Sequence, residues 1–424
     1  MKIRFYNARI LTMEKGCNEL MEGELWTEDD KISYLGESCS SDGDWDREID
    51  CQNNILMPGF KNAHTHTAMV FLRSYADDLP LQEWLYDRVF PMEEKLTKED
   101  QYELIKLGIL EYLTSGITSN FDMYLDNECH AKASMDMGFR TVLCGSMNDF
   151  GGTVPEIEQE YLTFNSMHPL ISGVIGFHAE YTTSKGSIEK LAALAEKYQA
   201  PVYLHLSETE KEVEECKKRY GMSPVRFLDS VEIFKYGGGG FHGVWMDDED
   251  MEICHKRGIS IVSNPCSNAK LASGFANLVK MCGKEINVAL GTDGAASNNA
   301  LDMFREMYLA AVLPKVTNHD AAAMDAGEVL RMATVGGAKA MLLPDCDTLS
   351  VGKQADLIMI DMHRPNMQPE NHIIKNIVYS GSKENVKITM VAGKILYENG
   401  EFFVGEPAED IYRKANEIIK RIAN

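Results

Sequence analysis

The sequence predicts an α/β protein: a TIM-type (β/α)8 barrel with a small β-sandwich domain built from both termini. Two observations lead to this fold class. Between residues 57 and 344, short apolar runs alternate with amphipathic stretches, as strands and helices do in a barrel of about 250 residues. At 1–56 and 345–424, the apolar residues instead follow the short spacing of strands. We therefore expect a barrel domain at 57–344 and a β-sandwich domain at 1–56 plus 345–424.

The amino-terminal segment has a β pattern. Ile3, Phe5, Ala8 and Ile10 stand among polar residues, and residues 25–35 form a second strand-like stretch. No helix of useful length is expected before residue 55.

Eight strands are expected along the barrel, at 55–60, 117–121, 140–144, 171–177, 202–205, 240–242, 259–263 and 286–290. Helical patterns separate most of them, at 126–137, 155–167, 187–199, 208–219 and 247–257. The best-marked helix begins after Thr97, which is placed to form a capping box with Asp100, and it closes at Gly116. A doubly wound open sheet is disfavoured because no Gly-x-Gly-x-x-Gly follows a strand. We interpret the glycines at 237–240 as a flexible entry to a strand.

The carboxyl-terminal segment returns to a β pattern. Strands are expected at 355–361, 377–380, 386–392 and 395–397, and an amphipathic helix at 408–422.

The composition limits the classes of partner. The net charge of -23 disfavours nucleic acid and anionic membranes, and no apolar run approaches the ~20 residues of a membrane span. The first residues do not resemble a signal peptide, and the ten cysteines contain no Cys-x-x-Cys. We therefore expect a cytoplasmic, homo-oligomeric enzyme with a small-molecule substrate and reduced thiols.

Polar residues that bind metals or transfer protons fall where the expected strands end, which is the active-site rim of such barrels. They are His64 and His66 after the first strand, His178 after the fourth, His205 and Glu208 after the fifth, His242 after the sixth, and Asp293 after the eighth.

Four of these residues form a plausible ligand set for one divalent ion, Zn²⁺ or a similar metal. His64 and His66 are two residues apart on an extended chain, so their imidazoles point to the same side. With His205 and Asp293 they offer three imidazoles and a carboxylate, a donor set that suits a catalytic metal with one open position. Such an ion lowers the pKa of its bound water to about 7. Glu208 and His242 are candidates for the proton transfers.

The motifs PGF followed by HTH, then HLSET, a lone histidine on the next strand and GTDGAASNN resemble the amidohydrolase superfamily. The resemblance covers nearly the whole chain and is nearest to the methylthioadenosine/S-adenosylhomocysteine deaminases of its deaminase and chlorohydrolase branch. It implies a metal-bearing barrel with a β-sandwich from both termini. We expect one divalent ion, Zn²⁺ first and Fe²⁺ as the second candidate. The resemblance further implies that Glu93 binds ribose hydroxyls and that His178 contacts the substrate.

The mechanism that the resemblance implies is attack of metal-bound hydroxide on C6 of an adenine ring, with release of ammonia. Glu208 protonates the adjacent ring nitrogen, His242 orients the hydroxide, and Asp293 accepts the proton of water. Relatives that act on S-adenosylhomocysteine use arginines after the third strand to meet its carboxylate. Residues 144–156 contain no Arg or Lys, so methylthioadenosine, adenosine or 5′-deoxyadenosine is the expected type of substrate.

Other readings stay open at this point. The same site suits deamination of another aminated heterocycle, such as a purine base, a pterin or a triazine. It also suits hydrolysis of a cyclic amide or a carbon–halogen bond. A non-enzymatic scaffold is disfavoured because the complete set of metal-binding and proton-transfer residues is present.

Overall fold

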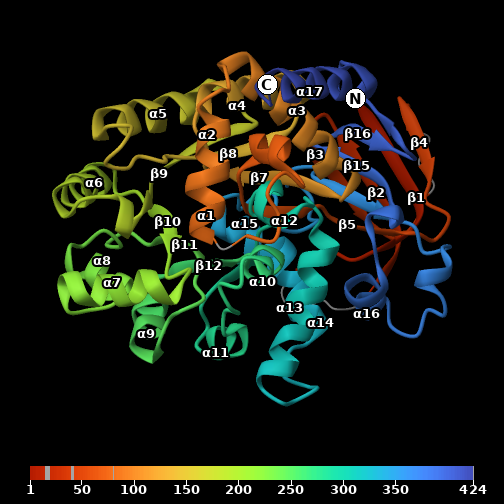
Figure 1. Cartoon of the computed structure of the whole chain (residues 1–424). Coiled ribbons are helices and arrows are strands. Elements are labelled where there is room, and N and C mark those ends of the chain that lie inside the picture. Colours follow the sequence, from red (N-terminus) through yellow and green to blue (C-terminus); the bar gives the residue numbers. More distant parts are fainter. Residues whose placement is uncertain (15–19, 40–42, 80, 424) are drawn as a thin grey trace.

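The computed structural model describes residues 1–14, 20–39, 43–79 and 81–423, and it contains an eight-stranded parallel barrel beside a second sheet (Figure 1). The barrel strands follow one another in sequence order around the sheet. Strand β13 returns to β6, where the N–H of Asp293 donates to the carbonyl of His64 at 3.0 Å. The predicted barrel is confirmed. Its strands are β6 (Phe60–Thr65), β7 (Ile117–Asp122), β8 (Arg140–Cys144), β9 (Ile171–Ala179), β10 (Val202–Leu206), β11 (Gly238–His242), β12 (Ile259–Ser263) and β13 (Val288–Leu290).

Helices surround the barrel and fill the connections between its strands (Figure 1). The predicted capping box is present at α3: the Thr97 hydroxyl accepts from the N–H of Asp100, whose carboxylate accepts from the N–H of Thr97. The helices are α1 (Leu81–Trp84), α2 (Phe90–Glu93), α3 (Lys98–Thr114), α4 (Asn127–Met137), α5 (Val154–Met167), α6 (Lys185–Tyr198), α7 (Glu210–Tyr220), α8 (Pro224–Ser230), α9 (Asp248–Arg257), α10 (Pro265–Lys270), α11 (Leu278–Gly283), α12 (Ala295–Asn298), α13 (Met303–Thr317), α14 (Ala326–Arg331) and α15 (Gly337–Ala340).

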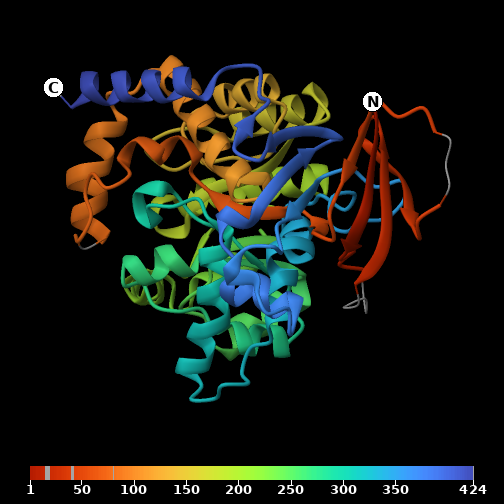
Figure 2. The same cartoon turned by 90° about the vertical axis from the view of Figure 1, so that its right-hand side faces the viewer.

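The second sheet draws its nine strands from both ends of the chain, as predicted, and it stands to one side of the barrel (Figure 2). Strand β5 joins the two ends, because it pairs in parallel with β1 and antiparallel with β14. Phe5, Leu25, Leu357 and Ile388 share its buried core. The strands are β1 (Lys2–Ile10), β2 (Met21–Glu28), β3 (Lys31–Gly36), β4 (Arg47–Asp50), β5 (Ile55–Pro58), β14 (Leu357–Ile360), β15 (Val386–Val391), β16 (Lys394–Glu398) and β17 (Glu401–Phe402).

The chain ends in helix α17 (Ala408–Ile422), at the bounds that the sequence predicts. This helix leaves the second sheet and packs against α3 on the barrel (Figure 1). Arg421 forms an ion pair with Asp100, and Lys95 donates to the carbonyl of Ile422 at 2.6 Å. The carboxyl terminus is thus fastened to the first long helix of the barrel.

Three predictions about local structure are wrong. The expected strand at 55–60 is two strands divided at Gly59, of which only β6 belongs to the barrel. The stretch 25–35 is a hairpin of β2 and β3. Residues 377–380 are helical, because Asn376–Ser380 continues the short helix α16 (Ile373–Lys375) as a π-helical turn.

The glycine run at 237–240 was also misread, since three of its members lie within β11. A Cβ atom at Gly239 would stand 2.5 Å from the ring of Tyr203 on the neighbouring strand. Glycine at this position therefore lets a buried tyrosine pack against the backbone, and the run is part of the barrel wall.

Two bulk properties of the described residues complete the fold. No helix among them is both long enough and apolar enough to cross a bilayer. Nine of the ten cysteines fall within the described residues, and all nine are free thiols.

Candidate metal and catalytic site

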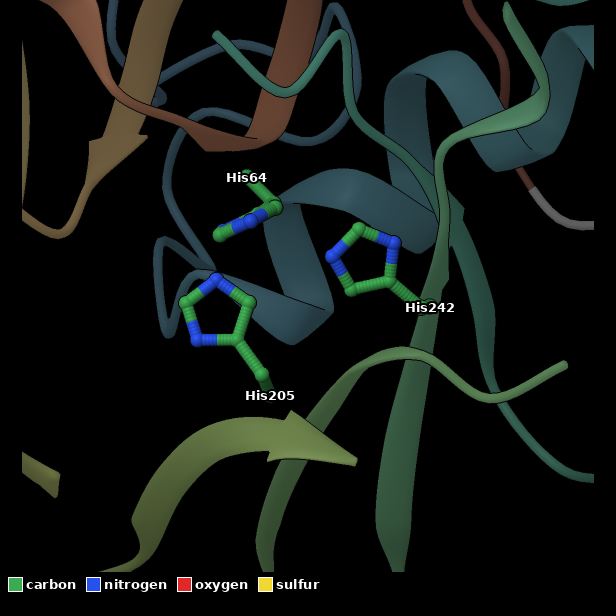
Figure 3. A group of neighbouring side chains, drawn as sticks. All are labelled: His64, His205 and His242. Atoms are coloured by element: carbon green, nitrogen blue, oxygen red, sulfur yellow. The ribbon is translucent and has the colours of Figure 1, made fainter. Parts of the chain in front are cut away.

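The predicted site residues meet at the carboxyl ends of the barrel strands. His64 lies on β6 with no exposed surface, and its ring is 4.9 Å from those of both His66 and His205, between centroids. His64, His205 and His242 point toward one common point (Figure 3). Their ligand atoms lie within 4.8 Å of one another, as do those of His64, His66 and Asp293. The two groups share His64, so all five residues form one cluster.

The hydrogen bonds of His66 and His205 fix which ring nitrogen faces the cluster. Nδ1 of His205 lies 2.8 Å from the carbonyl of His178, and Nδ1 of His66 bonds the carbonyl of Met123. A carbonyl only accepts hydrogen bonds, so each Nδ1 carries the proton and each Nε2 presents a lone pair. These two Nε2 atoms are 3.4 Å apart. Two lone pairs at this distance repel each other unless a cation lies between them.

His64 is suited to the same cation. Both of its ring nitrogens are buried and have no hydrogen-bond partner, which is costly for polar atoms in a protein interior. Burial and the neighbouring histidines hold the pKa of His64 well below its usual range, and burial does the same to His205. Neutral imidazoles are the form that binds metals, and buried orphan nitrogens are what an ion would satisfy.

Asp293 supplies the negative charge of the cluster. Its Oδ1 lies 3.3 Å from Nε2 of His66 and 3.7 Å from Nε2 of His64. Its Oδ2 accepts from the hydroxyls of Ser267 at 2.6 Å and Ser297 at 2.8 Å. Burial alone would raise the pKa of Asp293, but the adjacent histidines and these hydroxyls lower it. The carboxylate is therefore held ionised and in one orientation.

Glu208 and His242 form a pair beside the cluster. Oε2 of Glu208 lies 3.8 Å from Nε2 of His242, and Ser273 donates to Oε1 at 3.4 Å. Burial raises the pKa of Glu208. Burial also acts to lower the pKa of His242, but the carboxylates of Glu208 and Asp293 outweigh it and the pKa is raised. Both groups are thus shifted toward the protonated form, as proton donors need to be.

The two residues expected to touch the substrate also lie at this rim. The ring of His178 is 4.8 Å from that of His205, and its Nδ1 lies 2.9 Å from the hydroxyl of Thr182. Glu93 ends α2 and is buried, with its Oε1 accepting from the hydroxyl of Tyr124 at 2.5 Å. Burial raises the pKa of Glu93 to about 7.

No residue after the seventh barrel strand is among the predicted site residues, although the structure brings two of them into the site. Asn268 lies with Oδ1 2.8 Å from Nδ1 of His242, and Ser267 bonds Asp293. Both follow β12 in the run SNPCSNA, and polar residues directly after a barrel strand were a usable signal. Tyr124, which holds Glu93, also follows a barrel strand directly, two residues after β7.

Comparison with known proteins agrees with this geometry. The amidohydrolase family model matches residues 55–396, most of the chain. The chain belongs to the amidohydrolase family. Among curated relatives, this amidohydrolase is 38% identical to a 5-methylthioadenosine/S-adenosylhomocysteine deaminase of Thermoanaerobacter pseudethanolicus, over 99% of this chain and 100% of the relative. It is also 38% identical to a 5′-deoxyadenosine deaminase of Methanobrevibacter smithii, over 95% and 94% of the two chains.

A solved structure extends the likeness to three dimensions. An adenosine deaminase from Xanthomonas campestris with bound zinc superposes with a TM-score of 0.92 at 30% identity, covering 100% of this chain and 98% of that one. The family and the histidine-rich cluster together support a divalent metal ion in this amidohydrolase. Its relatives act on small molecules, and this chain has a small-molecule substrate as well.

Proposed function

We propose that this amidohydrolase deaminates an adenine nucleoside. Water replaces the amino group at C6 of the adenine ring, and the products are ammonia and the 6-oxo purine nucleoside. The single observation that carries the proposal is the pair of facing acceptor nitrogens of His66 and His205 beside the Asp293 carboxylate. Relatives named as 5-methylthioadenosine/S-adenosylhomocysteine and 5′-deoxyadenosine deaminases support the choice of substrate.

The proposed metal ligands are His64, His66, His205 and Asp293. Three neutral imidazoles and one carboxylate are a donor set that zinc prefers, and Fe²⁺ is the second candidate. His242 is near enough to count among the ligands, but its Nδ1 bonds Asn268 and its Nε2 faces Glu208, which favours a proton-handling role. A divalent ion bound here would supply Lewis acidity and lower the pKa of a water molecule.

The proton transfers are assigned to three side chains. Glu208, whose pKa burial raises, gives its proton to the ring nitrogen next to C6 and so makes C6 more electrophilic. His242 donates a hydrogen bond to the oxygen that adds to C6 and stabilises its negative charge. Asp293 is ionised, takes a proton from the attacking water and passes it to the departing amino group, which leaves as ammonia. As the C6 oxygen becomes the 6-oxo group, it gives its remaining proton to the Glu208 carboxylate, which restores the acid.

Glu93 and His178 are proposed to hold the nucleoside. One oxygen of Glu93 is occupied by Tyr124, so the other is left to accept hydrogen bonds from the two ribose hydroxyls. His178 stands next to the proposed ligand His205 and contacts the substrate there.

The loop after β8 favours an uncharged 5′ substituent. The N–H of Asp149 in this loop donates to the carbonyl of Thr182 at 2.9 Å, and the hydroxyl of Thr182 contacts His178. The loop carries the carboxylate of Asp149 and the exposed ring of Phe150, without an Arg or Lys in 144–156. A desolvated substrate carboxylate would find no cationic partner in this segment. Methylthioadenosine, 5′-deoxyadenosine and adenosine are therefore preferred over S-adenosylhomocysteine.

A substrate panel tests the proposal. Metal-loaded enzyme is incubated with the four nucleosides above and with guanine, a pterin, an aminotriazine and a chlorotriazine, and ammonia and chloride are both measured. We expect ammonia from the nucleosides, with kcat/KM lowest for S-adenosylhomocysteine. Ammonia from the other heterocycles alone, or chloride release, would replace the proposed substrate. Metal analysis of the same preparation identifies the ion.

Three further proposals concern the whole molecule. Residues 1–56 and 345–424 form one folding unit beside a barrel at 57–344, with β5 crossing the division. The protein works in a reducing cytoplasm, which the nine free thiols among the described residues support. It assembles as a homo-oligomer, and light scattering of the purified protein measures its mass.

A further inference from the structure

A second carboxylate lies behind Glu208 and has no role in the chemistry proposed above. Glu212 is on α7, is buried, and accepts two hydrogen bonds from the backbone. Its Oε1 accepts from the N–H of Ser207 at 2.7 Å, and its Oε2 accepts from the N–H of Glu208 at 2.8 Å. Each oxygen of this carboxylate thus accepts from a peptide group of the loop that carries the proposed proton donor.

These hydrogen bonds go beyond those of an ordinary helix start. Thr209 is the N-cap of α7, and its hydroxyl accepts from the N–H of Glu212. A glutamate at this third position of a helix commonly returns the bond to the N–H of the cap residue itself. Here the carboxylate interacts with the N–H of the cap residue and also bonds the two residues before the cap, so its contacts extend beyond the helix and into the site.

The loop between β10 and α7 needs such a constraint. Ser207 has a φ of +51°, a left-handed conformation that costs free energy for a residue with a side chain and persists only when its surroundings enforce it. The carbonyl of Ser207 accepts from the N–H of Trp245 at 2.8 Å. The backbone of Ser207 is therefore held at both ends: Glu212 accepts from its N–H, and Trp245 in the loop after β11 donates to its carbonyl.

We propose that Glu212 is a positioning residue for the reaction: it holds the backbone of Glu208 so that this side chain stays beside His242 and Ser273. The inference rests on the proposed function, because it assumes that Glu208 is the proton donor. Burial raises the pKa of Glu212 to about 7, and the N–H groups of Glu208 and Ser207 oppose that rise. Burying this carboxylate costs free energy, and its hydrogen bonds to the loop offset part of that cost.

The test is Glu212→Gln in the metal-loaded enzyme. A carboxamide has one acceptor oxygen, and its NH2 group meets the second backbone N–H without forming a bond. A misplacement of about 1 Å in a reacting group costs about 10²-fold in rate. We therefore expect kcat to fall by about 10–100-fold, with KM and metal content within about twofold of wild type. Glu212→Asp keeps the charge but is one methylene shorter, and we expect the same split between kcat and KM.

The matched control is Thr209→Val, which removes the N-cap acceptor of the same helix but leaves both bonds of Glu212 to the loop. We expect it to lower Tm, with kcat within about twofold of wild type. Loss of kcat in both variants in proportion to their loss of Tm would show that Glu212 only stabilises α7. Wild-type kcat in folded, metal-loaded Glu212→Gln, or failure of both Glu212 variants to fold, would also overturn the proposal.

A double-mutant cycle separates this inference from the function on which it rests. If Glu212 acts through Glu208, Glu212→Gln costs little further activity in a Glu208→Gln background. Independent, multiplying losses would reject the coupling and leave the deaminase proposal intact. Full turnover by Glu208→Gln alone would instead reject the proposed role of Glu208, and the positioning role would fall with it.

Discussion

Strand β6 carries Lys61 at the amino end of the barrel strands, the lower end, and His64 near their carboxyl end, the upper end. The two ends differ in whether their buried polar atoms have hydrogen-bond partners. At the lower end, Lys61 is fully buried and donates to the carbonyl of Gly59 at 2.9 Å and the hydroxyl of Thr118 at 2.8 Å. Nearby, Arg140 forms a two-pronged ion pair with Asp356, at 2.6 and 3.1 Å.

At the upper end, the same strand leaves polar atoms without partners. Both ring nitrogens of His64 lack hydrogen bonds, and the lone pairs of His66 and His205 face each other. Residues with positive φ also gather here, at Ser207, His242 and Asp293. The lower end is built as a protein interior normally is: Arg140 is paired with Asp356, and the ammonium of Lys61 donates to two oxygen atoms. The upper end holds imidazole nitrogens without partners, and a metal ion and a substrate would bind to such atoms.

The largest effect that separates the two ends is expected from Glu208→Gln. A glutamine has no proton to give, and general acid catalysis is worth about 10²–10⁴-fold in rate. We expect kcat to fall by about this factor while Tm and metal content stay near wild type, measured by ammonia release, thermal denaturation and metal analysis. A parallel loss of stability would mean that this end of the barrel also serves the fold.

Asp356→Asn is the corresponding change at the lower end. It leaves Arg140 buried beside a neutral group, and breaking a buried ion pair costs about 3–5 kcal/mol. Denaturant unfolding should show that loss, whereas kcat per folded molecule should not change. A variant with normal stability and low activity would contradict the division between the two ends.

Glu93→Gln tests whether the upper end sacrifices stability for function. Burial raises the pKa of Glu93 from an ordinary 4.5 to about 7, so its carboxyl favours the folded state only while protonated. This contribution is complete below pH 4.5 and is lost as the pH rises through about 7. Glutamine stays neutral and can still accept from Tyr124. At pH 8 the variant should be more stable than wild type, by up to about 3 kcal/mol.

The pH dependence provides the control for Glu93→Gln. Between pH 4.5 and 7 the wild-type protein should lose stability relative to the variant, and below pH 4.5 the two should converge. KM for the nucleoside should rise because the proposed bond acceptor for ribose is weakened. Equal free energies of unfolding for the two proteins at pH 8 would show that the buried carboxyl of Glu93 does not destabilise the fold.

The smallest effect is expected from Lys61→Met at the lower end. Two hydrogen bonds are lost, at about 1 kcal/mol each, but a charge no longer has to be buried and methionine fills a similar volume. We expect a net change in unfolding free energy of about 1 kcal/mol or less, measured by denaturant titration. A loss as large as that of Asp356→Asn would mean that Lys61 belongs to the ion pair.

The predictable parts of this molecule are those where one local rule suffices. His205 and His242 could be placed at the rim because each ends a short apolar run, and the carboxyl ends of parallel strands share one edge. Thr97 and Asp100 marked the start of α3 because a capping box depends on four consecutive residues. These features carry their explanation within a few positions of the sequence.

The parts that escaped prediction depend on distant contacts. The run before Gly59 is as apolar as the barrel strand after it, and only its pairing with β14 assigns it to the other sheet. Residues 377–380 form a short apolar run whose spacing suits either a strand or a helix. The bonds of Glu212 to the peptide groups before its own helix cap leave no mark in the sequence beyond a glutamate four residues after another.

The pairing of β5 with β14 has a consequence for synthesis on the ribosome. Pro58 faces Leu357, so one edge of β5 has no neighbour until the intervening chain has been made. At about 5–20 residues added per second, this takes roughly 15–60 s. During that interval the edge of Ile55, Leu56 and Met57 lacks its partner strand, and an unpaired apolar edge is a template for misassociation.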